Sequence, residues 1–208
     1  MLRKHLFWIL PIFWLAPGLA LAETGSADEL VKNVTTEVLT ILREDKGIQS
    51  GNRQRAISLI ENKVAPHFDF DRMTSLAVGR AWQQADDSQR KALTSEFRTL
   101  LVRTYANSLT AYRDQTVSFM LPAKAAGGDE VTVRSQINQP GGQPISLNYS
   151  LARKEGGWKV FDVVIANVSL VTNYRGSFAS EVDKGGIAGL LKALQEKNRR
   201  PDATKSPA

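Results

Sequence analysis

The sequence of 208 residues contains no cysteine and only two histidines, His5 and His67. The absence of cysteine excludes disulfide bonds, thiol nucleophiles and thiolate metal sites. Two histidines leave little material for a metal centre built on imidazole ligands. The remaining composition, with 42% hydrophobic and 23% charged residues, is that of an ordinary globular chain rather than a disordered or collagen-like one. The length predicts a single folded domain, and much enzyme chemistry is already disfavoured.

Residues 1–22 have the pattern of a cleavable secretory signal peptide. Arg3 and Lys4 form a short basic start, an apolar run follows from Leu6 to Leu15, and Ala20-Leu21-Ala22 supplies small residues before the expected cleavage point. A membrane anchor is disfavoured because prolines and a glycine interrupt a segment that is already short for a bilayer. Cleavage would leave residues 23–208 with 25 Lys and Arg against 21 Asp and Glu, a formal charge of +4. No cysteine follows the signal, so we expect an exported protein without a lipid anchor.

The positive charge is spread thinly, with a local excess only near the carboxyl end. We expect residues 199–208 to be a disordered tail because they are polar and contain proline. No stripe of basic residues interleaved with aromatic ones occurs, so nucleic acid is not an expected partner. Weak attraction to anionic membrane surfaces stays open.

Hydrophobic periodicity divides residues 23–198 into three parts within one domain. Steps of three and four predict helices in a part spanning 23–113, with Asp28, Asn52 and Ser88 as capping residues. The period becomes two over 115–168, where three glycine-containing turns separate four strands, which predicts an antiparallel meander. Helical spacing returns over 169–198 and is interrupted at Gly185-Gly186. We therefore predict an α+β fold in which several helices wrap a curved four-stranded antiparallel sheet.

Asp162 is the one carboxylate inside the most apolar strand, residues 160–165. A buried carboxylate requires a raised pKa or a fixed partner, and Arg80, Asn173 and Arg175 are the candidate partners. We favour a tether between this strand and the next helix, and a catalytic base is the alternative. His67, between Pro66 and Phe68, is interpreted as a capping or surface residue. No nucleophile elbow, phosphate-binding loop or dinucleotide-binding motif occurs.

The same strand is apolar on both alternating faces apart from Asp162. A strand packed against helices on one side only should be polar on the other. The second face is therefore covered by more helix, or it lines a cavity. The pattern by itself favours ordinary burial.

Two stretches of the sequence carry a resemblance to a known family. The first consists of PHFDFDRM (66–73), GRAW (79–82) and FRTLLVRTY (97–105), and the second of WKVFDVVI (158–165) and NVSLVTNYR (167–175). They resemble the MlaC family of periplasmic phospholipid-binding proteins, also called the toluene-tolerance Ttg2D family. Asn167 stands where that family usually has glycine before Val-Ser-Leu, and asparagine tolerates the left-handed backbone that such a bend requires.

The resemblance implies a soluble periplasmic carrier that shuttles a diacyl phospholipid and so maintains outer-membrane lipid asymmetry. Its implied partners are an inner-membrane ABC transporter complex and an outer-membrane lipoprotein/porin complex, and a monomer without a cofactor is expected. The implied fold is a cone like that of nuclear transport factor 2 (NTF2) and cystatin, with helices enclosing an apolar pocket. Asp162 and Arg175 lie in family motifs, and the resemblance implies architectural roles for both.

The free energy of moving a lipid through water explains why such a carrier is needed. Each methylene moved out of water is worth roughly 0.8 kcal/mol, so two tails of about sixteen carbons oppose bare desorption by a barrier on the order of 20 kcal/mol or more. A carrier must bury both tails in a large dry cavity, and head-group contacts can be few.

Candidate lipid-binding residues are those on apolar faces of the sheet and of the helices over it, although core packing would give each the same periodicity. The candidates are Met73, Leu76, Trp82, Phe97, Leu101, Tyr105, Phe119, Val133, Leu147, Tyr149, Val163, Ile165, Val168 and Tyr174. Two alternative functions stay open: an enzyme on an NTF2-like fold that acts on an apolar substrate with Asp162 as base, and a periplasmic chaperone with an open groove.

Overall fold

Six α-helices and one antiparallel sheet make up residues 25–200, the part of the chain that the computed structural model describes, apart from the side chains of 124–127. The predicted α+β class is confirmed. The helices are α1 (Ala27–Glu44), α2 (Lys46–Gln49), α3 (Arg53–Leu59), α4 (Phe70–Val78), α5 (Asp87–Thr110) and α6 (Leu170–Arg199), joined in places by the π-helical turn η1 (Ile60–Val64) and the 3₁₀ turns η2 (Ala65–His67) and η3 (Gly79–Gln84). The predicted signal peptide lies outside the described residues.

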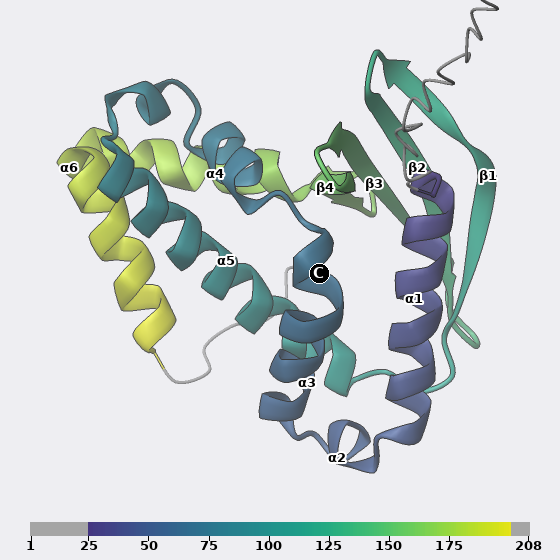
Figure 1. Ribbon diagram of the computed structural model, residues 1–208. Coiled ribbons are helices and arrows are strands. Elements are labelled where there is room, and N and C mark those ends of the chain that lie inside the picture. Colours follow the sequence, from purple (N-terminus) through teal and green to yellow (C-terminus); the bar gives the residue numbers. More distant parts are fainter. Residues whose placement is uncertain (1–24, 201–208) are drawn as a thin grey trace, which may run out of the picture.

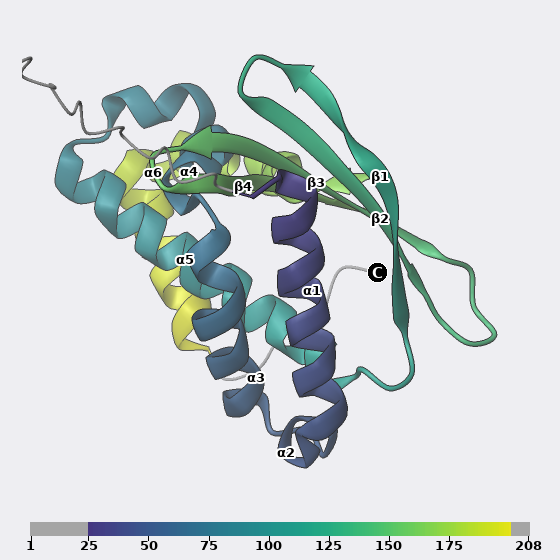
Figure 2. The ribbon, with the colours of Figure 1, turned by 45° about the vertical axis from the view of Figure 1, so that its right-hand side comes forward.

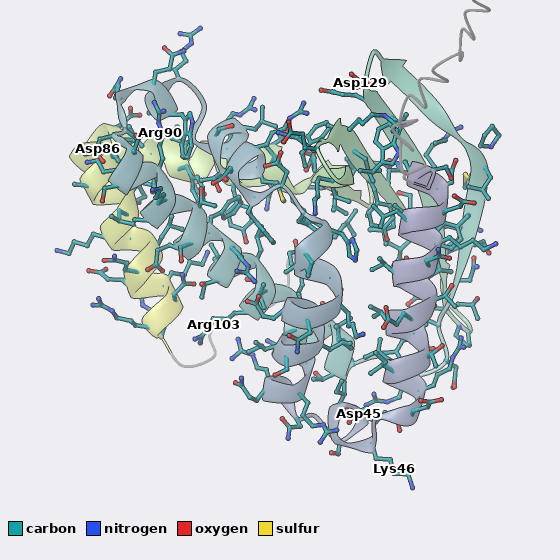
Figure 3. The ribbon with its side chains drawn as sticks, in the orientation of Figure 1. Asp45, Lys46, Asp86, Arg90, Arg103 and Asp129 are labelled. Atoms are coloured by element: carbon teal, nitrogen blue, oxygen red, sulfur yellow. The ribbon has the colours of Figure 1, made fainter. Side chains whose placement is uncertain are left out.

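Two helix starts differ by two residues from the predicted caps. Ser26 caps α1, since its hydroxyl accepts from the backbone of Glu29 while the Glu29 carboxylate accepts from the backbone of Ser26. Asp86 forms the same reciprocal box at the start of α5, where Figure 3 labels it. Each of these caps has a glutamate or glutamine three residues later that completes the box, whereas Asp28 and Ser88 have no such residue at that position. The predicted cap Asn52 is confirmed at α3.

The sheet follows the predicted meander and adds a short fifth strand. Its strands are β1 (Thr116–Gly127), β2 (Glu130–Asn138), β3 (Ile145–Lys154), β4 (Gly157–Ile165) and β5 (Val168–Ser169), paired in chain order. Ala166 and Asn167 turn the chain between β4 and β5 with φ of 49° and 67°, so Asn167 does adopt the left-handed backbone. β1 and β5 are the edge strands of the sheet that residues 25–200 form. The sheet is therefore open rather than closed, and the likeness to an NTF2 cone stays a prediction.

One face of the sheet looks toward the helices. Val133, Tyr149 and Val163 stand opposite one another on β2, β3 and β4 on this inner face, as the alternation requires. Figures 1 and 2 show α1 lying across this face and the bundle of α4, α5 and α6 on the side of the sheet where β4 lies. Three clusters of buried apolar side chains result: one between α1 and the sheet, one inside the bundle, and one where the end of α1 meets α2, α3 and α5.

The bundle of α4, α5 and α6 contains a filled aromatic core. The ring of Phe97 lies 5.0 Å from that of Tyr174 and 5.1 Å from that of Phe178, both edge to face. Met73 is fully buried in the same cluster. Such pairs contribute roughly 0.5–1.5 kcal/mol beyond the area they bury. The three aromatic rings pack directly on one another.

Helix α6 extends further than the sequence predicts. It is kinked at Gly185 and Gly186, as expected, but continues to Arg199. The amide of Asn198 donates to the Glu96 backbone carbonyl at 2.9 Å, and this hydrogen bond holds the end of α6 on α5. The prediction that the disordered tail begins at Arg199 is therefore wrong, because this residue is still helical. Residues 201–208 lie outside the described part of the chain.

Candidate functional site

A cavity of about 460 Å³ lies between α1 and the inner face of the sheet; we call it the larger chamber. Apolar side chains spaced three and four apart on α1 form one wall, and the inner faces of β1, β2 and β3 form the opposite one. The lining residues are Leu30, Val31, Val34, Thr35, Val38, Leu39, Leu42, Val64, His67, Phe68, Ser108, Leu109, Ala111, Tyr112, Gln115, Val117, Ile137, Gln139, Ile145, Leu147, Tyr149 and Val160. No Asp, Glu, Lys or Arg occurs among them.

A second cavity of about 240 Å³ adjoins the first; we call it the smaller chamber. It lies between η1, α4 and α5 on one side and β3 and β4 on the other. The residues that line it alone are Ile60, Ala65, Phe70, Met73, Leu101, Val102, Tyr105, Val163, Ile165 and Leu170. Those shared with the larger chamber are Val38, Val64, Phe68, Leu109, Leu147 and Tyr149.

The backbone fixes the position of Phe68, which lies on the shared wall. Pro66 ends the preceding helical run within η2, and Phe68 continues in extended conformation as a bridge partner of Val160 on β4. The next residue, Asp69, donates its N–H to the Val160 carbonyl at 2.8 Å. These contacts hold the Phe68 ring where helices and sheet meet.

Tyr149, Tyr105 and His67 on these walls have pKa values shifted toward their neutral forms. Burial raises the pKa of Tyr149 to about 12, and hydrogen bonding to Thr35 and Ser135 offsets only part of this effect. Burial likewise raises the pKa of Tyr105. The pKa of His67 is lowered by burial and then by Lys159, against a smaller opposite effect of Glu37. The walls therefore carry no formal charge near neutral pH.

Seven of the fourteen predicted lipid-binding residues line these chambers: Met73, Leu101, Tyr105, Leu147, Tyr149, Val163 and Ile165. The others lie elsewhere. Phe97 and Tyr174 belong to the aromatic core, with Leu76 and Trp82 packed against it. Phe119 and Val133 sit on the inner face of the sheet without reaching a chamber. Val168 lies on β5 with 52% of its surface exposed.

The α1 wall and Phe68 were not among the predicted site residues. The stripe of apolar residues on α1 predicted a helix with one buried face, but the same stripe serves a filled core and a cavity wall equally well. The polar lining residues Gln115 and Gln139 lie in the connections that follow α5 and β2, where no sequence pattern distinguishes them.

Asp162 is a structural tether. Its Oδ1 accepts hydrogen bonds from the backbone N–H groups of Val163 (2.9 Å) and Val171 (3.2 Å), and its Oδ2 accepts from the Ser169 hydroxyl at 2.6 Å. Ser169 in turn caps α6. The carboxylate therefore fastens β4 to the start of α6, as we favoured, and it lines neither chamber.

The predicted partners of Asp162 are wrong. Backbone N–H groups and a hydroxyl at the helix start lie within its short reach, and among the described residues neither Arg80 nor Asn173 forms a hydrogen bond with it. Arg175 instead donates two hydrogen bonds, of 3.1 and 2.9 Å, to the Leu76 carbonyl and so joins α6 to α4. Among residues 25–200, no group of three or more histidines and carboxylates is placed to hold a metal ion.

Comparison with known proteins gives consistent matches. The model of the MlaC protein family matches residues 32–196. The chain is 27% identical over 214 residues to "Toluene tolerance protein ttg2D" of Pseudomonas putida, covering 98% of this chain and 97% of that one. It is 26% identical over 198 residues to the "Intermembrane phospholipid transport system binding protein MlaC" of Haemophilus influenzae, covering 90% and 89%.

A solved structure is also similar. The phospholipid-binding protein from Ralstonia solanacearum, determined in complex with a phospholipid, superposes with a TM-score of 0.78 at 36% sequence identity. The match covers 84% of this chain and 97% of that one.

Proposed function

Because this chain belongs to the MlaC family, we propose that it is the phospholipid-binding protein of an intermembrane transport system, and that the two chambers are its lipid site. It is a binding protein rather than an enzyme. The observation that supports this site most directly is the pair of adjoining apolar cavities, of about 460 and 240 Å³, whose walls hold no formally charged side chain. Acyl chains need such an environment and little else.

Transport between membranes also requires export and docking partners. We propose that residues 1–22 direct the chain to the periplasm, where it exchanges diacyl phospholipid with an inner-membrane ABC transporter complex and an outer-membrane lipoprotein/porin complex. Within residues 25–200, no helix combines the length and hydropathy needed to cross a membrane. The helices that wall the chambers would complete the apolar pocket of the predicted NTF2-like cone.

The proposal is tested by purifying residues 23–208 and analysing solvent extracts by mass spectrometry. We expect phospholipid in the preparation, and we expect delipidated protein to take up phospholipid from vesicles. A protein that is recovered empty and that also fails to load from vesicles would refute the proposed function. Stable capture of unfolded outer-membrane protein, with no lipid, would support the chaperone alternative instead.

A further inference from the structure

The two chambers adjoin along side chains that the fold holds in place. Phe68 is fixed by its bridge to Val160 and stacks on Phe70 with ring centroids 5.7 Å apart. Leu147 and Tyr149 project from the inner face of β3, opposite Ile165 and Val163 on β4. Phe68, Leu147 and Tyr149 line both chambers, so they stand where the two chambers meet.

The chambers differ in polarity. Besides its tyrosines, the larger chamber is lined by Thr35, His67, Ser108, Gln115 and Gln139. The smaller chamber has no polar side-chain group except the tyrosine hydroxyls. The ester and head groups of a lipid need hydrogen-bond partners when they leave water, so they belong with the larger chamber. The smaller chamber suits hydrocarbon alone.

The chambers also differ in size. An apolar cavity of roughly 150 Å³ holds one benzene, about 25 Å³ for each carbon. On that scale the 460 Å³ of the larger chamber takes about eighteen carbons and the 240 Å³ of the smaller takes about ten. One long acyl chain fits the first, and only part of a second long chain fits the other.

We infer that the protein holds the two acyl chains of one phospholipid in separate chambers, a full-length chain in the larger and about ten carbons of the other in the smaller. The inference rests on the proposed function and makes Val163 and Leu101, which line the smaller chamber alone, determinants of acyl-chain length. Binding of the second chain is favourable for up to about ten carbons, and any further methylenes stay outside the smaller chamber.

The first test uses wild-type protein. Delipidated protein is equilibrated with vesicles made of phosphatidylcholines that share a palmitoyl first chain and carry second chains of eight to sixteen carbons in equal amounts. The bound pool is then analysed by mass spectrometry. Since each methylene left in water costs about fourfold in affinity, we expect second chains of about ten carbons to be enriched at least tenfold over sixteen. A bound pool with the composition of the vesicles, or enriched in long chains, would overturn the inference.

The second test uses a matched pair of strand variants, Val163→Phe and Val117→Phe. Val163 lines only the smaller chamber, and Val117 lines only the larger one. We expect Val163→Phe to shift the preferred second chain to fewer carbons, and Val117→Phe to leave that preference unchanged. Equal shifts in both variants, or none in either, would contradict separate chambers. The first test stands even if Val163→Phe does not fold.

The two proposals fail differently. Wild-type protein that takes up no phospholipid from the vesicles refutes the proposed function. Wild-type protein that loads phospholipid without selecting the length of the second chain leaves that function intact and refutes only the two-chamber inference.

Discussion

The Nε of Arg43 donates a hydrogen bond of 3.1 Å to the hydroxyl of Tyr112, which joins the last turn of α1 to the residues that follow α5. The same hydroxyl donates to the Gln115 carbonyl at 3.1 Å. At the other end of α1, Asp28 accepts from the backbone N–H of Ala123 on β1 at 3.0 Å. α1 is thus fastened at both ends, while its middle forms a wall of the larger chamber.

Replacing Tyr112 by Phe should loosen one end of this wall. The change keeps the ring but removes both hydrogen bonds, and we expect a loss of about 1 kcal/mol in unfolding free energy together with faster lipid transfer from protein to vesicles. Stopped-flow measurement with a fluorescent phospholipid gives the rate. Ser177→Ala, which loses a hydroxyl bond to the Tyr174 carbonyl in α6, is the control. Equal transfer rates in the two variants would contradict a role for this fastening.

Asp162→Asn should destabilise the protein without emptying it. The amide cannot reproduce both carboxylate oxygens as acceptors for Val163, Val171 and Ser169, so we expect a loss of about 1–3 kcal/mol. Urea denaturation measures the loss, and lipid extraction measures the bound phospholipid per protein. An unchanged urea midpoint would contradict the tether.

Val163→Glu should expel lipid because it places a carboxylate in the wall of the smaller chamber, where the native side chain is 6% exposed. Burying an unpaired charge is strongly unfavourable both for the fold and for neighbouring acyl chains. Val164→Glu, the next residue on the opposite face of β4, is the matched control. We expect less bound lipid only in the first variant, as measured by mass spectrometry, and lipid content near that of wild type would remove Val163 from the site.

His67 should make stability depend on pH. Its pKa is lowered in the folded protein from the ordinary value of 6.5, mainly by burial, so the unfolded chain binds the proton first as pH falls. The associated loss of stability begins near pH 6.5 and is complete below the lowered pKa. His67→Gln removes this contribution, and we expect a shallower fall in unfolding free energy between pH 7 and 5. Urea titrations at several pH values test this, and parallel curves would contradict it.

Gly79→Ala should destabilise through the backbone alone. Gly79 ends α4 with φ of 66° and ψ of −135°, and a Cβ there would meet no atom within 4 Å. The strain should therefore cost on the order of 1–3 kcal/mol. Gly176→Ala is the matched control, since a Cβ there is also uncrowded but the backbone is helical, and it should stabilise by about 0.4–1 kcal/mol. Thermal unfolding of both variants measures the difference, and equal shifts would contradict the strain.

The sequence predicted the type and order of the main elements because each has a clear hydrophobic period. The caps of α1 and α5 were predicted two residues late because Asp28 and Ser88 are residue types that often cap helices. Ser26 and Asp86 cap instead, since each also donates its backbone N–H to the side chain three residues later. β5 was missed because two residues are too few to show a period.

The site was harder to predict than the fold. Leu147 and Phe97 carry the same signal in the sequence, a large apolar residue on a buried face. One lines the chambers and the other fills the aromatic core, a difference set by how far apart the packed elements lie. Asp162 illustrates the same limit, since its partners are backbone N–H groups and a nearby hydroxyl rather than a distant charged residue.

The aromatic core of α4, α5 and α6 bears on the unloaded state of the carrier. Phe97, Tyr174 and Phe178 contact one another and line neither chamber, so their packing does not depend on cargo. The contacts among these three rings therefore lie outside the chambers that would hold the lipid. A protein with such a core can lose its lipid and still keep the contacts that join α4, α5 and α6.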